Sequence, residues 1–245
     1  MYRKILLWLV LFIFIIPTVT VGAPPDNYEP RVGEVLTYKV IVKSVIHGAD
    51  QVIKVVSNGS YKNHEVVNVK VSMNTVGMVK GITNYSEVEE MVLDKAGLFP
   101  WYFRREVTEA DQTDIEEVTF DYQQGIAFRT VMKDNKPKKQ SEIKLPGYVQ
   151  DGLSLPFYLR KGNLKPGQHQ LYFYSNGKID PVVFQLKESN QPLKLECGTY
   201  PQSYHISNEQ SKITIIVSKN EPRLPLIIQK MAQFGKVEAR LINVN

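Results

Sequence analysis

The feature that most constrains this chain is an alternation of apolar and polar residues that recurs along its length. Every second residue is apolar in the segment 36–43, and the same pattern appears at 67–73, 117–122 and 213–218. Successive side chains of a β-strand point to opposite faces, so a period of two predicts strands with one buried face. We expect about a dozen strands, joined mostly by hairpins. Turn-forming dipeptides separate the runs, among them Asn58-Gly59, Gln124-Gly125 and Asn176-Gly177.

One segment, residues 147–162, departs from this pattern. Leu155, Tyr158 and Leu159 recur there at helical spacing, which predicts one short helix that covers an open end of the sheet. Asp151 and Ser154 are both candidates for its N-cap, because each side-chain oxygen can accept a hydrogen bond from the first turn.

The mature chain shows no internal division. No linker, repeat or change of composition interrupts residues 24–245, so we predict a single all-β domain of mostly antiparallel strands. Twist accumulates in a sheet of this size, and its exposed edges invite aggregation. We therefore expect the sheet to curl into a barrel, a half-barrel or a sandwich.

The first 23 residues have the pattern of a signal peptide. Two basic residues precede an apolar run over 5–16, Pro17 ends this run, and small residues precede Ala23. The run is shorter than the ~20 residues that a membrane-spanning helix needs. We predict cleavage after Ala23, a periplasmic or secreted protein, and no transmembrane segment in the mature chain. The alternative is an uncleaved N-terminal anchor.

The composition excludes several classes of protein. Lys and Arg number 30 against 25 Asp and Glu, a balance too mild for a nucleic-acid-binding surface. The densest basic run, Lys133 to Lys144, indicates a solvated hairpin loop rather than a phosphate contact. One Cys cannot build a disulfide or a Cys-based metal site, and the four His residues lack metal-binding spacing. We expect no nucleic-acid partner, no metal and no cofactor; the oligomeric state stays open.

Short segments along the chain match a known family in their order and spacing. They are RVGEVLTY at 31–38, VTFD at 118–121, VQDGLS at 149–154, LKPG at 164–167 and GTY at 198–200. With them, the chain resembles the exported bacterial envelope proteins catalogued as domain of unknown function 3108. The resemblance implies a secreted, β-rich domain without an established reaction. Cys197 departs from the family pattern, which more often has a small residue at that position.

No group of residues has a pattern typical of catalysis. Ser154 lies in GLSLP, which lacks the second glycine of a G-x-S-x-G nucleophile elbow. Asp111, Asp114, Glu116 and Glu117 form an acidic cluster, but their place at a turn and a strand start favours a solvated edge over paired catalytic carboxylates. We assign no catalytic residue, and an enzyme is the class that we favour least.

Three polar residues have two interpretations each. Cys197, as an odd thiol in an oxidising compartment, is either a reactive or dimer-linking group or a buried side chain, and we favour burial. Asp151 and Arg160 lie in one family segment. They either pair with each other across the helix or hold a ligand carboxylate, and we favour pairing.

Aromatic clusters give the best functional lead. They occur at 99–103, at 157–158 and at 172–174. Strand alternation admits only half of each cluster into one interior, so the others face solvent, a groove, a partner or lipid, unless they cap the ends of the core. The candidate ligand-binding residues are Trp101, Tyr102, Phe157, Tyr158 and Arg160.

Two functions are compatible with these features. The first is a noncatalytic binding module for a lipid-like or other amphipathic ligand of the envelope. The second is a structural or assembly protein that binds another envelope protein through its sheet edge or outer face. A hollow apolar interior would favour the first function, and a packed core would favour the second.

Overall fold

β-Strands dominate the part of the chain that the computed structural model describes, namely residues 28–134, 136–161, 165–232 and 235–245. The predicted signal peptide, residues 1–23, lies outside this part. The strands are β1 (Val35–Val42), β2 (Ile46–Tyr61), β3 (His64–Thr75), β4 (Tyr85–Asp94), β5 (Pro100–Glu109), β6 (Gln112–Asp121), β7 (Ile126–Lys133), β8 (Lys136–Lys144), β9 (Val149–Gln150), β10 (Gly167–Ser175), β11 (Lys178–Ser189), β12 (Leu193–Leu195), β13 (Gly198–Tyr200), β14 (Ser203–Asn208), β15 (Ile213–Ser218), β16 (Pro225–Ala232) and β17 (Gly235–Val244). The helices are α1 (Gly77–Ile82) and α2 (Ser154–Lys161). Within the described part, no helix combines the length and the apolar character that crossing a membrane requires.

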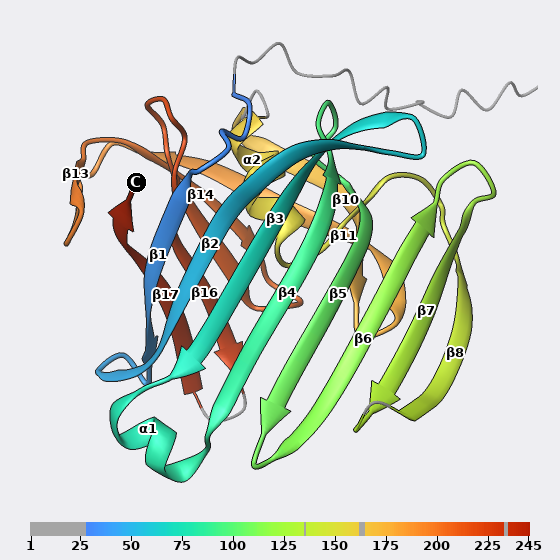
Figure 1. Cartoon of the computed structure of the whole chain (residues 1–245). Helices are drawn as coiled ribbons and strands as arrows, with labels where there is room; N and C mark the ends of the chain where they lie inside the picture. The colour runs from blue at the N-terminus through green and yellow to red at the C-terminus, as the bar shows by residue number, and fades with distance from the viewer. Residues whose placement is uncertain (1–27, 135, 162–164, 233–234) are drawn as a thin grey trace, which may run out of the picture.

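A single sheet of 15 strands rolls up, in the order β8-β7-β6-β5-β4-β3-β2-β1-β17-β16-β15-β14-β11-β10-β9. Neighbouring strands pair antiparallel, except for the parallel pair of β9 and β10. In Figure 1, β1 to β8 form what we call the front wall, and β10, β11 and β14 to β17 form the back wall. The described residues make no ladder between the edge strands β8 and β9. The predicted all-β fold, curled as a half-barrel, is confirmed.

Side chains, rather than a hydrogen-bonded ladder, cover the seam of the roll. Tyr174 of β10 packs against Phe103 and Phe120 on the inner face of the front wall, with ring centroids 5.5 and 5.8 Å apart. Gly177, in the turn after β10, lies next to the side chain of Arg129 on β7. The β10–β11 hairpin is therefore tucked inside the front wall, and the two ends of the sheet overlap.

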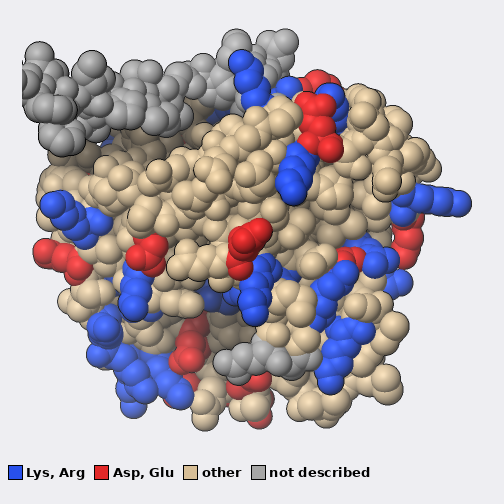
Figure 2. Space-filling model, turned by 180° about the vertical axis from the view of Figure 1, so that it is seen from behind, with Lys and Arg blue, Asp and Glu red and all other residues tan. Residues whose placement is uncertain are grey.

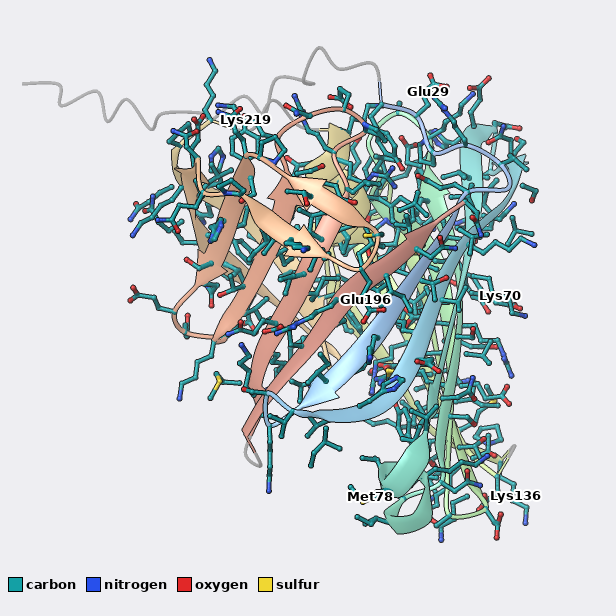
Figure 3. The ribbon with its side chains drawn as sticks, turned by 90° about the vertical axis from the view of Figure 1, so that its left-hand side faces the viewer. Glu29, Lys70, Met78, Lys136, Glu196 and Lys219 are labelled. Atoms are coloured by element: carbon teal, nitrogen blue, oxygen red, sulfur yellow. The ribbon has the colours of Figure 1, made fainter. Side chains whose placement is uncertain are left out.

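A separate two-stranded sheet, β12 with β13, lies against the outer side of the roll, where Figure 3 labels Glu196. It carries Cys197, which is a free, half-buried thiol. The Cys197 Sγ donates to the carbonyl oxygen of Leu241 at 3.3 Å and lies 3.3 Å from the Tyr200 hydroxyl. The predicted burial of this thiol is therefore only partial.

Two local predictions were wrong. Asn58-Gly59 is no turn, because β2 continues to Tyr61, and the turn falls on Lys62 and Asn63, whose φ values are 48° and 65°. A bulge between Val55 and Ser57 shifts the register of β2 against β3 before the turn is reached. We expected one helix, but α1 is a second one. None of its side chains is buried, so no apolar periodicity marks it in the sequence.

Helix α2 lies between the two walls and fills one end of the roll. Asp151 is its cap: its Oδ1 accepts hydrogen bonds from the backbone N–H groups of Leu153 and Ser154 at 2.9 and 2.7 Å. Ser154 does not cap the first turn as proposed, because its Oγ instead accepts a hydrogen bond from the N–H of Asp151 at 2.8 Å. The two residues thus bond to each other reciprocally, as in a capping box.

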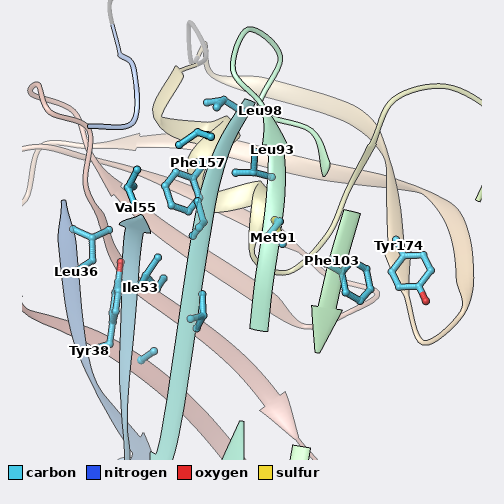
Figure 4. Packing of buried hydrophobic residues seen from close by; sticks show 14 of the residues in the cluster. Leu36, Tyr38, Ile53, Val55, Met91, Leu93, Leu98, Phe103, Phe157 and Tyr174 are labelled. Atoms are coloured by element: carbon cyan, nitrogen blue, oxygen red, sulfur yellow. The ribbon is translucent and has the colours of Figure 1, made fainter. Parts of the chain in front are cut away.

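The interior around α2 is packed. Phe157 points from the helix into the apolar cluster of the front wall, among side chains that include Val55 and Leu93 (Figure 4). Leu155 and Leu159 pack into a second cluster with residues of the back wall. The space between Phe157 and its neighbours on β1, β2 and β16 leaves no room for a water molecule. The described residues around Phe157 therefore leave no room for a ligand beside it.

Candidate functional site

The inner face of the front wall changes from buried to half-exposed along its strands. In β4, Leu93 and Met91 are 0% and 2% exposed, whereas Tyr85 at the other end of the strand is half-exposed. In β6, Phe120 is 0% exposed and the side chain of Glu116 is 15% exposed. The buried ends lie beside α2 and the half-exposed ends lie toward α1 (Figure 1). We call the second end the open end of the roll.

Two views locate the open end. In Figure 3, Met78 of α1 and Lys136 of β8 mark it, opposite Glu29 and Lys219 at the other end. Figure 2, seen from behind, shows a hollow below the centre of that face, with acidic and basic side chains in it and around it. The molecule is thus filled at the α2 end and concave toward the open end.

Charged side chains cross the front wall where burial begins to decrease. The strand register aligns Glu89 of β4 with Arg105 of β5, and Arg105 with Glu116 of β6. Glu87 and Arg129 lie on the same face, one diagonal step away, because residues two apart on a strand share a face. We call Glu87, Glu89, Arg105, Glu116 and Arg129 the inner charged row.

Both arginines of the row hold a carboxylate. The Arg105 Nε donates to Glu87 Oε1 at 2.5 Å, and the Arg129 Nε donates to Glu116 Oε1 at 2.6 Å. The Tyr174 hydroxyl donates to the same Glu116 oxygen at 2.6 Å. The second pair also joins β6 and β7 to the tucked hairpin. Because these charges are only partly desolvated, they stabilise the row modestly and position its members.

Glu89 has no such partner. It is 8% exposed, and none of the described residues forms a hydrogen bond or an ion pair with its carboxyl group. Burial raises the pKa of Glu89 well above its usual value, and the nearby carboxylates of Asp151 and Glu87 raise it further. A carboxyl group in this environment tends to hold a proton, and it is a ready acceptor for any cation that reaches it.

Two further acceptors lie beside α2 without a donor. Asp151 uses Oδ1 to cap the helix, but its Oδ2 is buried and has no hydrogen-bond partner in the described chain. The Oε1 atom of Gln150 is buried and unpartnered in the same way. Both residues are 5% exposed, and burial raises the pKa of Asp151. Buried acceptors of this kind are usually bonded to an ordered water or another donor.

The back wall presents apolar side chains on the face that packs against α2. Phe184 and Ile215 are buried against α2, and the strand alternation continues their face toward the open end. The side chains on that continuation are apolar and half-buried. They are Leu171, Phe173, Val182, Ile213 and Ile228, which we call the apolar wall. On β10, Phe173 alternates with Tyr174, whose ring packs on the inner face of the front wall, so the apolar wall points away from the Glu116–Arg129 pair.

The predicted ligand-binding residues do not form one site. Trp101 is 4% exposed and lies in an aromatic cluster at the α2 end, where its ring stacks on His64 with centroids 4.4 Å apart. Tyr102, the next residue on β5, is half-exposed and follows the opposite parity from Phe103, which places it on the outer face. The two neighbours differ in burial, and a bulge in the pairing of β4 with β5 interrupts the alternation at this point.

The three predicted residues on α2 have structural contacts. Phe157 is buried in the core, and Tyr158 packs half-buried against the cluster of the back wall. Arg160 is 1% exposed and holds Glu34 through two hydrogen bonds, at 3.0 and 2.6 Å. The predicted pair of Arg160 with Asp151 was therefore wrong, because the N-terminal segment supplies the carboxylate.

The inner charged row was missed or misread in the sequence. Glu116 was assigned to a solvated edge, but it faces inward with its side chain 15% exposed. Glu89 was not singled out at all. One signal could have found both: Glu89 shares its parity with Met91 and Leu93, and Glu116 shares its parity with Val118 and Phe120. Charged residues on the buried parity of a strand are candidates for a site.

Comparison with known families assigns this chain. The model of a family described as protein of unknown function DUF3108 matches residues 36–242, most of the sequence. The chain belongs to the DUF3108 family. The resemblance inferred from its short segments is therefore confirmed. No match to a curated protein is found.

One solved structure agrees with the fold. A β-barrel-like protein of domain of unknown function DUF1849 from Brucella abortus is similar over 89% of this chain and 99% of its own, with 10% identity and a TM-score of 0.56. A candidate lipoprotein from Parabacteroides distasonis aligns over 90% and 98% of the two chains, with 8% identity and a TM-score of 0.28, too low to compare folds. The first likeness supports a barrel-like DUF3108 fold and no particular activity.

Proposed function

We propose that this DUF3108 protein is an exported, noncatalytic binding module that holds an amphipathic ligand in the open end of its roll. The observation that carries the proposal is the change in packing along one interior. Around α2 the interior is filled, whereas the apolar wall, farther along the same face of the back wall, is only partly buried. Half-exposed apolar side chains on a concave face provide the hydrophobic part of a binding site.

The ligand therefore occupies a different place from the one that the sequence suggested. A chain bound against α2 would have to displace Phe157, which is 2% exposed and lies in the packed core. A chain bound at the open end contacts side chains that are already half-exposed. Binding there needs no cavity to open in the core, which is why the geometry favours the open end.

Native mass spectrometry of protein expressed with its own N-terminal segment tests the proposal. We expect an adduct with the mass of a lipid or another amphipathic molecule. Val182 and Val183 provide a matched pair of variants, because these neighbours on β11 have opposite parity and only Val182 belongs to the apolar wall. Val182→Glu should remove the adduct, and Val183→Glu, at a position 46% exposed, should retain it. Equal adducts in both variants would refute the site.

The export part of the proposal depends on residues 1–23, whose pattern is that of a signal peptide. The mature protein should begin at Pro24. N-terminal sequencing of protein from the periplasm or the medium tests this expectation. An intact Met1 in a membrane fraction would instead favour the uncleaved anchor.

A second function, a structural or assembly role, is favoured by the edge strand β8. Most of its side chains are exposed, and lysines occupy Lys136, Lys138, Lys139 and Lys144. Edge lysines usually protect an edge from unwanted pairing, but an extended acidic segment of a partner could add to it. Absence of any small-molecule adduct, together with a partner crosslinked to β8, would favour this function over the first.

A further inference from the structure

Four apolar side chains are exposed at the open end of the roll. Val45, in the turn between β1 and β2, is 82% exposed, and Met78 and Ile82 of α1 are 74% and 87% exposed. Met231, near the end of β16, is 46% exposed. Helix α1 buries none of its side chains, so its apolar residues contribute little to the core. Apolar side chains gathered on one exposed surface indicate a contact with a partner or with lipid.

Backbone hydrogen bonds hold the segments that carry these side chains together. The N–H of Lys43 donates to the carbonyl oxygen of Lys236 at 2.8 Å, which joins the β1–β2 turn to the β16–β17 hairpin. The N–H of Val76 donates to the carbonyl oxygen of Gly48 at 2.9 Å, which joins the residue before α1 to the start of β2. Helix α1 and the β1–β2 turn lie side by side in Figure 1. The exposed apolar side chains therefore share one surface, at the end that Met78 marks in Figure 3.

Lysines without ion pairs accompany these apolar side chains. Lys43, Lys80, Lys212 and Lys230 are exposed, and no described residue forms an ion pair with any of them. Lys212 belongs to this surface because its carbonyl oxygen accepts a hydrogen bond from the N–H of Met231 at 3.1 Å. We call these four lysines and the four exposed apolar side chains the tip surface.

Few acidic groups compensate these lysines. No Asp or Glu occurs in the three segments that carry most of the tip surface, namely 43–47, 76–84 and 230–236. The acidic residues that adjoin these segments are Asp50, Glu109, Glu209 and Glu238. All but Glu209 already accept a hydrogen bond or an ion pair from a neighbouring side chain. The tip surface therefore offers more free ammonium groups than free carboxylates.

We propose that the tip surface docks the roll onto a bilayer that contains anionic phospholipid. The exposed apolar side chains enter the boundary between head groups and acyl chains, and the lysine ammonium groups contact the phosphates. Lysine suits this position because its methylene groups lie along apolar neighbours while the ammonium group stays in water. In this orientation the open end of the roll faces the bilayer. The inference goes beyond the proposed function and requires no ligand inside the roll.

An acidic protein is the other partner that these lysines would attract. A stable protein–protein contact buries roughly 800 Å² on each partner and is centred on side chains that fill pockets. The apolar side chains of the tip surface instead come from separate segments, and Lys80 lies between Met78 and Ile82 in the sequence. Apolar and basic side chains that are interspersed over a small area suit a fluid surface better than a shaped pocket. The observations therefore favour a bilayer.

Flotation with lipid vesicles tests the apolar part of the tip surface. Protein exported from the full-length gene and purified without detergent is mixed with vesicles of phosphatidylcholine, either alone or with about 30% phosphatidylglycerol. We expect binding to the anionic vesicles only, and weaker binding as salt increases. Ile82→Glu should weaken this binding about 10-fold or more. The matched control is Val32→Glu, because Val32 is 53% exposed and lies three residues from Glu29 at the opposite end.

A pair of lysine substitutions tests the basic part. One lysine near an anionic surface contributes about 5-fold to binding, so Lys43→Gln/Lys80→Gln should weaken it about 25-fold. Lys144→Gln/Lys187→Gln is the control. Both of these lysines are exposed and form no ion pair with the described residues. They lie near the ends of β8 and β11 that point away from the open end, so their loss should leave vesicle binding unchanged.

Each outcome of the flotation assay has a defined meaning. Binding to anionic vesicles that only the tip variants weaken supports the proposal. Equal binding to both vesicle types, or controls as weak as the tip variants, overturns it. No binding to either vesicle type also overturns it, and a protein crosslinked through Lys43 or Lys80 would then be the partner. Val182→Glu, which should lose the ligand adduct, should still bind vesicles, so failure of the proposed function is distinguishable from failure of this inference.

Discussion

The contact between α2 and the N-terminal segment should be the most sensitive polar contact in this fold. The Arg160 Nη1 and Nη2 atoms donate to the two carboxylate oxygens of Glu34, at 3.0 and 2.6 Å. The guanidinium carbon lies 3.9 Å from the centre of the Tyr28 ring, and the Tyr28 hydroxyl donates to Glu34 at 3.2 Å. The pair therefore fastens the segment before β1 over the helix that fills the roll.

The two partners differ in burial, and this difference sets the expected magnitudes. The side chain of Arg160 is 1% exposed and that of Glu34 is 13% exposed. Glu34→Gln leaves a buried guanidinium without a counter-charge, and the loss of one partner of a buried pair costs about 3–5 kcal/mol. Arg160→Met removes the more buried charge and leaves a carboxylate that water can reach. We expect it to cost less, about 2–3 kcal/mol.

Urea unfolding of the single variants and of the double variant Glu34→Gln/Arg160→Met measures these costs. The double variant should recover part of the loss of Glu34→Gln, because no charge then remains buried. Lys39→Met is the control, since Lys39 meets Glu196 at 3.5 Å on the surface and should change the stability by at most about 1 kcal/mol. A cost for Glu34→Gln as small as that of the control, or a double variant less stable than Glu34→Gln, would refute the reasoning.

Three further predictions follow from burial. Glu89→Gln should raise the free energy of unfolding at neutral pH. Burial raises the pKa of Glu89 above 4.5, so above that pH the native state binds more protons than the unfolded state. The stability of the wild-type protein therefore falls as pH rises through this window. Urea melts from pH 4 to pH 8 should show the gap between variant and wild type widening. Asp151→Ala should cost about 0.5–2 kcal/mol through loss of the cap, also measured by urea. Phe157→Ser should cost about 3–5 kcal/mol, whereas Tyr148→Ser, at a position 65% exposed, should be nearly neutral in the same urea melts.

The alternation of apolar and polar residues was sufficient to predict the fold class, because a period of two indicates a β-strand wherever one face of the element must be buried. It was not sufficient for the turns. Asn58-Gly59 has the composition of a hairpin turn, yet a sixteen-residue β2 passes through it, because pairing with β3 continues to Tyr61 and His64. Tertiary pairing overrode a local signal there. Helix α1 carries no buried residue, so no pattern could have revealed it.

The candidate site could not be derived from the sequence because its members meet only through strand register. Glu89, Arg105 and Glu116 lie on three strands, and nothing in the chain fixes which residue of β4 faces which residue of β5. The prediction of Arg160 with Asp151 failed for the same reason: proximity in sequence suggested a pair, and Glu34, which lies 126 positions away, supplied the contact.

The charged residues that the sequence analysis did not identify as a site also indicate where a ligand binds. An inner strand face that ran from Leu93 and Met91 to further apolar residues would pack better than one that continues with Glu89 and Glu87. Because burial raises the pKa of Glu89, this residue lowers the stability of the fold at neutral pH. No described residue forms a hydrogen bond with its carboxyl group that would offset the cost. A buried charge with a cost and no structural benefit is expected where binding, rather than folding, gives the benefit. If Glu89→Gln stabilises the fold and also removes the adduct that native mass spectrometry detects, this trade-off is demonstrated at Glu89; if the variant stabilises the fold and retains the adduct, Glu89 lies outside the ligand site.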